Sequence, residues 1–404
     1  MAAADSSGSG SPIVFDPTSR EYQADPYPIL GLIREAEPVY RSNMGWLVTR
    51  YEHAVAILRD WRTWGVAFTR ETQKSRYGPG PMLEYANRRM SGYNPPDHTR
   101  LRSLTTKAFT ARRVEALRPR IQSIAQDLLR QVDGVREFDI IEVLAHPLPC
   151  QVICEMVGVP LASSPQLSDW TGAVQSALAP IPRPDRLPAA NQAASEFVAF
   201  IRALVADRRK RPGDDLLSAL IAAEDSGQKL TEDELVATVL FLFTAGHSTT
   251  RDLVGSGLVA LLHNRDQWLR LIEQESLVPM AVEECLRYAP SILLLGRRAI
   301  ADTAVADIPI SAGEAVFVSI AAANRDPRRF VEPDRFDIAR DDNEHLTFGG
   351  GIHFCLGATL ARVEAQVIFA ALARRYPNLR LSEQTVEWRD TISFRGPKAV
   401  RVAV

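Results

Sequence analysis

The chain has 404 residues, of which 46% are hydrophobic, and its 47 lysines and arginines nearly balance its 49 aspartates and glutamates. A chain of this length can bury a large core, and a net charge of -2 excludes the strongly basic character typical of nucleic-acid-binding proteins. Four cysteines are too few for a disulfide framework, so we expect a cytoplasmic protein in a reducing environment.

Neither the N-terminal residues nor the apolar runs indicate a membrane protein. Residues 1–11 are small and polar, with no basic start and no apolar run, so we expect a disordered tail. The longest apolar stretch, about 235–245, is far shorter than the roughly 20 residues needed to cross a bilayer. No repeat or linker divides the remainder, and we expect a single domain over 12–404.

The first third of the chain is predicted to hold short elements around a long connection. Alternating residues predict a hairpin over 39–49, followed by a helix over 51–60. Charged residues and a Gly-Pro-Gly-Pro run predict an irregular connection over 65–93. Two prolines then predict a helix start near Asp97.

The middle of the chain is mainly helical by its hydrophobic period. Residues 114–160 and 191–225 are expected to be helices. Between them we expect a linker over 161–190, since the proline-rich run 181–188 cannot form regular helix.

A long helix is predicted over 231–263, because Thr231 and Glu234 form a capping box before a periodic apolar run. It contains Ala-Gly-His-Ser-Thr-Thr at 245–250, a group of small and hydroxylated residues. Hydroxyls bonding back to the helix carbonyls would explain this group without a function. Alternatively, glycine and hydroxyls could open the helix and leave room for dioxygen and water.

The last third is predicted to mix helix and strand. Residues 265–288 are helical by period, and the apolar run 291–296 is a candidate core strand. Alternation predicts strands over 303–320 and a final strand pair over 385–404.

The most informative stretch is Phe348-Gly-Gly-Gly-Ile-His-Phe-Cys-Leu-Gly357, which precedes a predicted helix over 358–372. The glycines allow positive φ and close approach of the backbone to a flat partner. At a helix start, unpaired N–H groups stabilise the Cys355 thiolate, a ligand suited to a soft metal. Neither phosphate-loop pattern fits here, and the glycine spacing argues against a merely buried cysteine.

These residues resemble the FGxGxHxCxG signature of bacterial members of the cytochrome P-450 superfamily. The resemblance covers residues 12–404 and implies that Cys355 is the axial thiolate ligand of haem b iron. It also implies haem contacts from the loop and from the long helix. These are Phe348, Gly349, His353, Gly357, Ala245 and Gly246.

Three basic residues resemble the propionate ligands of that family. His98 and Arg102 lie four residues apart and, taken alone, indicate a solvated helix face. Their match to the segment DPPxHTRxR instead implies that they hold haem propionates. Arg297 matches the next propionate ligand, and Arg298 competes for that role.

The segment 245–250 resembles the family pattern AGx[DE]TT, which implies that Thr249 supports proton delivery during oxygen activation. Ser248 departs from the pattern, because a hydroxyl passes a proton but carries no charge at neutral pH. Three explanations are open. His247 or a water chain substitutes for the acid, the substrate supplies protons, or the reaction is not a plain hydroxylation.

The resemblance also implies a structural network and a substrate cavity. Glu284 and Arg287 match the ExxR motif, which Arg335 would complete behind the haem loop. The stretches 65–93 and 161–190 would form the lid. The expected cavity residues are Leu293, Leu294, Leu295, Ile392 and Phe394.

We therefore expect a mainly α (α+β) cytochrome P-450 fold and a haem-thiolate monooxygenase that hydroxylates or epoxidises a largely apolar small molecule. A secondary metabolite is the expected substrate class. Oxidative coupling or cyclisation is the alternative reaction, and a haem sensor without turnover is a third hypothesis.

No flavin or iron-sulfur segment is evident, so a ferredoxin with its reductase, or a flavodoxin, is expected to supply the electrons. The protein is expected to be a monomer. A group of basic residues is expected to form part of the surface on which the electron donor docks. These are Arg102, Lys107, Arg112 and Arg113.

Overall fold

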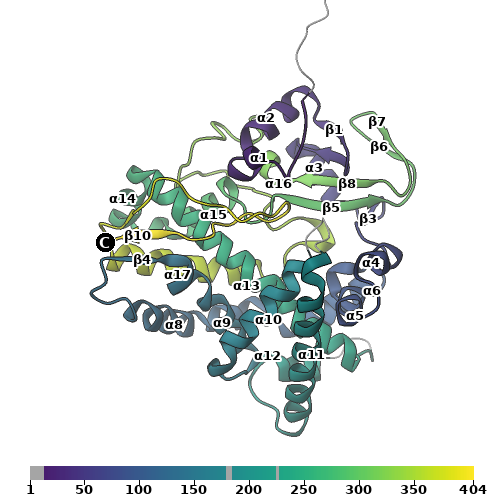
Figure 1. Ribbon diagram of the computed structural model, residues 1–404, viewed down its shortest axis with the longest axis horizontal. Coiled ribbons are helices and arrows are strands. Elements are labelled where there is room, and N and C mark those ends of the chain that lie inside the picture. The colour runs from purple at the N-terminus through teal and green to yellow at the C-terminus, as the bar shows by residue number, and fades with distance from the viewer. Residues whose placement is uncertain (1–12, 179–183, 224–226) are drawn as a thin grey trace, which may run out of the picture.

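The computed structural model describes residues 13–178, 184–223 and 227–404. The predicted tail and part of the proline-rich run therefore lie outside the described residues. Helices dominate, and a small sheet packs at one end (Figure 1). None of the helices in the described ranges combines the length and hydropathy of a membrane span.

The helix α13 (Glu232–His263) runs through the middle of the molecule (Figure 1). The predicted capping box is present, since Glu234 N donates to Thr231 Oγ1 at 3.3 Å and Thr231 N donates to Glu234 Oε2 at 2.9 Å. Most of its residues are buried, because helices pack against it along its length, and five of them make the most extensive contacts. These are α9 (Pro147–Val157), α10 (Ser164–Ala177), α11 (Leu187–Lys210), α15 (Val278–Tyr288) and α17 (Ala358–Arg375).

The larger sheet has five strands in the order β1-β2-β8-β5-β3. The predicted hairpin is confirmed as an antiparallel pair, and β2 pairs in parallel with β8. The strands are β1 (Val39–Ser42), β2 (Gly45–Val48), β3 (Trp64–Val66), β5 (Leu294–Ala299) and β8 (Ala315–Ser319). The two smaller sheets contain β4 (Glu137–Asp139), β9 (Arg380–Leu381) and β10 (Arg401–Ala403), and β6 (Thr303–Val305) with β7 (Ile308–Ile310).

The remaining helices surround this frame. They are α1 (Arg20–Ala24), α2 (Tyr27–Ala36), α3 (Tyr51–Arg59), α4 (Arg70–Tyr77), α5 (Pro81–Arg88), η1 (Met90–Gly92), α6 (Asp97–Ala108), α7 (Ala111–Ala116), α8 (Arg118–Arg130), η2 (Ile141–Ala145), η3 (Leu161–Ser163), η4 (Pro184–Arg186), α12 (Leu216–Ala222), α14 (Arg265–Glu273), η5 (Glu275–Leu277), α16 (Ile320–Ala323) and η6 (Gly351–His353).

Several predicted boundaries are wrong. The stretch 65–93 is not irregular, because Thr69 caps α4 and Pro81 begins α5. The linker predicted over 161–190 contains α10, which buries one face in the core. The helical predictions over 114–160 and 265–288 are interrupted by short strand, π-helical or 3₁₀ segments. Residues 401–403 pair with β4 and β9 rather than with their neighbours in the chain.

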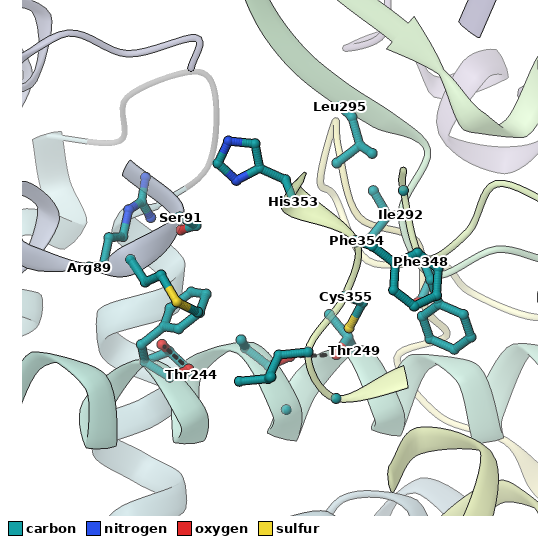
Figure 2. Close-up of a pocket in the computed structure, with 18 of the residues that line it drawn as sticks. Arg89, Ser91, Thr244, Thr249, Ile292, Leu295, Phe348, His353, Phe354 and Cys355 are labelled. Carbon is teal, nitrogen blue, oxygen red and sulfur yellow. Dashed lines mark hydrogen bonds between the residues drawn. The ribbon is translucent and has the colours of Figure 1, made fainter. Parts of the chain in front are cut away.

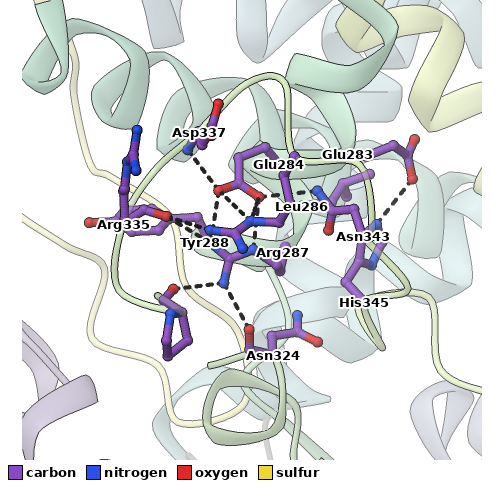
Figure 3. Close-up of polar contacts among 12 residues, drawn as sticks. Glu283, Glu284, Leu286, Arg287, Tyr288, Asn324, Arg335, Asp337, Asn343 and His345 are labelled. Carbon is purple, nitrogen blue, oxygen red and sulfur yellow. Dashed lines mark hydrogen bonds and ion pairs between the residues drawn. The ribbon is translucent and has the colours of Figure 1, made fainter. Parts of the chain in front are cut away.

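A buried ion-pair network lies next to the loop of Cys355. Glu284 and Arg287 both have fully buried side chains, and Arg287 Nε lies 2.8 Å from Glu284 Oε2 (Figure 3). Arg287 also donates to the carbonyls of Asn324 and Pro333, at 3.0 and 2.7 Å. The pair therefore satisfies backbone groups of a segment that has no regular secondary structure.

The prediction for the third member of this network is wrong. The Arg335 side chain is 59% exposed and pairs with Glu332, and only its carbonyl reaches Arg287. Arg340 takes the predicted place, with Nε 3.2 Å from Glu284 Oε2 and an 11% exposed side chain. The turn that directs Arg335 outward brings Arg340 inward, and sequence spacing alone does not reveal which one is buried.

The segment before Phe348 is tied to the same network. Thr347 Oγ1 donates to the Leu286 carbonyl at 2.6 Å, and Asn324 Nδ2 donates to Thr347 Oγ1 at 3.0 Å. Leu346 N donates to Asn324 Oδ1 at 2.7 Å. These buried bonds fix the start of the cysteine loop relative to α15.

Candidate active site

A cavity of about 450 Å³ lies between α13, β5 and the loop of Cys355. Phe348, Phe354 and Cys355 form one side, and Thr249 lies beside them on α13 (Figure 2). Most of the lining is apolar, which suits a small-molecule site with a few convergent polar groups.

The glycine loop presents Cys355 to this cavity. Cys355 N donates to the Phe348 carbonyl at 2.9 Å, which closes the loop, and α17 begins three residues later. Gly351 has φ +63°, and a Cβ there would lie 2.5 Å from the Leu58 carbonyl oxygen. A side chain at Gly351 would therefore push the loop off α3.

The thiol of Cys355 is accessible from the cavity although it lies deep in the protein. Burial raises its pKa, while the Gly357 backbone N–H and the charges of Arg102 and Arg362 oppose the rise. The helix start thus stabilises the Cys355 thiolate as expected. Without a further cation, this stabilisation is smaller than the effect of burial, which favours the neutral thiol.

Four of the basic side chains that line this cavity act on one another and have no carboxylate partner among the described residues. They are His98, Arg102, Arg297 and His353. The rings of His98 and His353 lie 4.2 Å apart, and His98 Nδ1 is buried without a hydrogen bond in the described part of the chain. Burial, and then the charge of Arg102, lowers the pKa of His98 to about 4.

The same surroundings affect the other members of this group. Burial lowers the pKa of Arg297 to about 10. Burial, followed by the charges of His98, Arg297 and Arg102, lowers the pKa of His353 to about 3. Mutual repulsion in a buried place is unfavourable, and anionic groups bound there would relieve it.

The geometry separates Arg297 from Arg298. Arg297 lines the cavity, whereas Arg298 Nε donates to the Ala67 carbonyl at 3.2 Å and its Nη1 contacts the Gly313 carbonyl. Strand alternation explains the difference, because neighbours in β5 point to opposite faces. Arg102 also lines the cavity, so it is not part of an external docking face; Lys107, Arg112 and Arg113 are exposed.

The small residues of α13 adjoin the cavity. Ala245, Gly246 and Thr249 line it, and Thr249 Oγ1 donates to the Ala245 carbonyl at 2.6 Å. A Cβ on Gly246 would lie 3.1 Å from Ile153 Cδ1, so the glycine permits close packing against α9.

Ser248 is placed differently from Thr249. It is not among the lining residues, and its hydroxyl donates to Gln175 Oε1 on α10. Gln175 itself lines the cavity. The amide therefore stands between Ser248 and the cavity.

His247 faces away from the cavity. Its Nε2 lies 2.8 Å from the His146 carbonyl oxygen and 3.5 Å from Ser168 Oγ. Burial, and then the charge of His146, lowers the pKa of His247 to about 3. Of the explanations for Ser248, direct substitution by His247 is therefore not favoured by the geometry.

This burial predicts an acid-dependent loss of stability. Below the ordinary histidine pKa of about 6.5, His247 is protonated in the unfolded chain but not in the folded chain. The free energy of unfolding therefore falls by about 1.4 kcal/mol per pH unit as the pH falls toward 3. Between pH 7 and 5, the urea midpoint of His247→Gln should fall less steeply than that of the native protein. The variant should take up one proton fewer on unfolding. Parallel pH profiles would contradict this prediction.

The predicted cavity wall is partly wrong. Leu294, Leu295 and Phe394 line the cavity, but Leu293 and Ile392 pack in a core cluster with Phe15 and Tyr22. Successive side chains of an extended segment point to opposite sides, so Ile292 and Ser393 line the cavity where Leu293 and Ile392 were predicted. The lining residues that sequence reasoning missed include Ile292, Ser393, Gln175, Arg89 and Ser91.

A family model described as Cytochrome P450 matches residues 186–392. This match and the similarity of the whole chain to curated relatives show that the chain belongs to the cytochrome P450 family. The predicted fold class, haem b cofactor and monooxygenase activity are thereby confirmed. The reaction of this family requires a substrate, dioxygen and redox partners.

Three relatives illustrate the similarity. The polyketide biosynthesis cytochrome P450 PksS of Bacillus subtilis is 37% identical, over 97% of this chain and 99% of that one. The 6-deoxyerythronolide B hydroxylase of Saccharopolyspora erythraea is 38% identical, over 94% and 96%. The structure of P450BioI with an acyl carrier protein has a TM-score of 0.90 at 35% identity and covers 96% and 100%.

The cavity fits haem b. Its apolar walls suit a porphyrin, and Cys355 offers a soft ligand for iron. The basic group of His98, Arg102, Arg297 and His353 suits two carboxylates, and His98 Nδ1 has no hydrogen-bond partner among the described residues. Glu364 is the one carboxyl among the described lining residues, and burial raises its pKa to about 8.

Proposed function

We propose that Cys355 Sγ would hold the haem iron of a monooxygenase whose substrate occupies the rest of the cavity. The observation that carries this is the accessible thiol opposite a mostly apolar space, with Thr249 beside it (Figure 2). When bound, haem b activates dioxygen with two external electrons so that one oxygen atom enters the substrate.

The basic residues have a positioning role in this proposal. Arg102 and Arg297 would pair with the propionates, and His98 and His353 would donate to them through their ring N–H groups. Burial and the neighbouring cations lower the pKa of both histidines, and bound carboxylates would oppose that effect. The residues 12–404 would act as one domain around this centre.

Thr249 is the proposed proton-delivery residue, because it lines the cavity beside Cys355 (Figure 2). Its hydroxyl donates to the Ala245 carbonyl at 2.6 Å, so its oxygen is free to accept a hydrogen bond from water in the cavity. Ser248 would supply protons to it only indirectly, since its hydroxyl is held by Gln175. Proton delivery in this chain would therefore depend on water in the cavity more than on a carboxylate.

This arrangement predicts different outcomes for the two hydroxyl residues. Thr249→Ala should lower the fraction of electrons recovered in product by about 10-fold or more, since a positioned proton donor contributes about 10²–10⁴ in rate. Ser248→Asp should change that fraction, because it adds a charge one residue away. Hydrogen peroxide formed per electron pair consumed reports it. Unchanged coupling in both variants would contradict the assigned roles.

The proposed substrate is a largely apolar secondary metabolite of the polyketide type. The apolar lining supports it, as do the relatives named for polyketide biosynthesis and for hydroxylation of 6-deoxyerythronolide B. Incubation of 6-deoxyerythronolide B with ¹⁸O₂ and a reducing system tests this class. A product heavier by one ¹⁸O atom supports hydroxylation or epoxidation; absence of any oxygenated product would count against this substrate class.

Oxidative coupling or cyclisation is the second candidate reaction. Ser248 keeps this reaction under consideration, because it stands where the family pattern has a carboxylate, and its hydroxyl is bonded to Gln175. A product that has lost two hydrogens and carries no ¹⁸O would identify it.

We also propose that the protein is a cytoplasmic monomer that receives electrons from a ferredoxin with its reductase, or from a flavodoxin. The exposed Lys107, Arg112 and Arg113 would form part of a basic docking face, which suits a partner with an acidic surface. A docking face of this kind should weaken as salt increases.

A further inference from the structure

Arg89 is a cationic side chain in an apolar cavity. It follows α5 directly, lines the cavity together with Ser91, and lies on the side opposite Cys355 (Figure 2). Its Nε is buried without a hydrogen bond, and no ion pair or hydrogen bond of its guanidinium involves another residue of the described ranges. A buried donor without an acceptor is costly unless a ligand supplies one.

Arg89 is distinct from the basic group that suits the haem propionates. The charges that act on His98 and His353 are those of Arg102, Arg297 and His98, and Arg89 is not among them. The charge of Arg89 instead acts on Tyr85 and Arg76, which belong to α5 and α4. This places the guanidinium at the end of the cavity formed by 70–92.

The backbone that carries Arg89 is firmly held. Tyr85, one helical turn earlier, shares a 2.6 Å hydrogen bond with Thr244 Oγ1 on α13. Met82 N donates to Asn191 Oδ1 on α11 at 3.0 Å. After Arg89 the chain turns, since Gly92 N donates to the Arg89 carbonyl at 2.9 Å.

The side chain is held as well. A Cβ on Gly92 would lie 3.7 Å from Arg89 Cγ and 3.9 Å from its Nε, so the arginine stem packs against the glycine. A cation held by both its backbone and its stem loses little conformational freedom when it binds an anion.

We propose that Arg89 is a substrate-anchoring residue that binds a carboxylate of the substrate on the side of the cavity opposite Cys355. A guanidinium in an apolar site binds a carboxylate more tightly than a hydroxyl, because the ion pair adds to the hydrogen bonds. The inference rests on the proposed substrate cavity and deepens the proposed substrate class, because a polyketide-type molecule that carries a carboxylate should bind more tightly than a neutral one. The anchored end would direct the other end of the molecule toward Cys355.

The test compares tetradecanoic acid with tetradecan-1-ol, which share an apolar chain and differ in charge. Dissociation constants are measured by calorimetry on the haem-loaded protein. The native protein should bind the acid about 10-fold more tightly than the alcohol or better. Arg89→Gln should lose this preference without weaker binding of the alcohol, and Arg89→Lys should keep part of it.

Arg88→Gln is the matched control. Arg88 is the preceding residue, its side chain is 38% exposed, and it pairs with Glu84 and Asp233 on the surface. Its removal should leave the preference for the acid unchanged.

Three outcomes would overturn the proposal. The first is a preference for the acid that persists in Arg89→Gln, and the second is a native protein that binds neither probe or binds both equally. The third is loss of haem from Arg89→Gln, which would assign Arg89 to the cofactor. The reduced carbon monoxide spectrum of each variant is recorded in parallel, so that failure of the anchor is distinguished from failure of the haem-thiolate centre.

Discussion

Replacing Arg287 by methionine is expected to lower the free energy of unfolding by about 3–5 kcal/mol, because it leaves the buried Glu284 without its main partner. Both side chains are fully buried, and Arg287 also satisfies the carbonyls of Asn324, Pro333 and Arg335. Methionine has a similar volume but donates no hydrogen bond. The same backbone segment leads to the Cys355 loop, so haem should dissociate more readily.

Arg335→Ala is the matched control for this prediction. Its exposed side chain pairs with Glu332 at the surface, so a change within about 0.5 kcal/mol is expected. Arg340→Ala should fall between the two, because Glu284 retains Arg287 and the Asp337 N–H. Urea midpoints and the rate of haem loss measure all three. Equal effects at Arg287 and Arg335 would contradict the assigned network.

Replacing Cys355 by alanine is expected to reduce product formation to the background rate. The thiolate is the proposed source of electron density for oxygen activation, and no other cysteine lines the cavity among the described residues. The variant should still fold, because the loop is held by backbone bonds such as Cys355 N to the Phe348 carbonyl.

Cys285→Ala controls for the loss of a thiol elsewhere. Cys285 is buried against Gly257, with Sγ 3.7 Å from its carbonyl oxygen, and takes no part in the cavity. Product formation per haem should be retained. An equal loss of turnover in both variants would point to a general effect of thiol removal on stability.

Features that depend on neighbouring residues in the chain could be predicted from the sequence. The capping box of α13 and the glycine loop around Cys355 are examples, because their hydrogen bonds and backbone angles are set within a few residues. Arg297 and Arg298 also differ for a local reason. Strand alternation predicts that the two side chains point to opposite faces of the sheet, but only the structure shows that Arg297 is the one that faces the cavity.

Features that depend on contacts between distant segments could not be predicted. Arg340 rather than Arg335 reaches Glu284 because an irregular segment folds back on α15. Gln175 lies in a region predicted to be a linker, yet α10 brings it to Ser248. Arg89 was hidden in a stretch predicted to be irregular, where only the packing of α5 against α13 makes it a lining residue.

The most direct test of the central claim is the absorption spectrum of the haem-loaded protein, reduced with dithionite and exposed to carbon monoxide, beside that of Cys355→Ser. The assignment predicts a strongly red-shifted Soret band in the native protein that disappears in the variant while haem is still bound. A native protein with a full complement of haem and no such band, or a variant that keeps the band, would contradict Cys355 as the thiolate ligand.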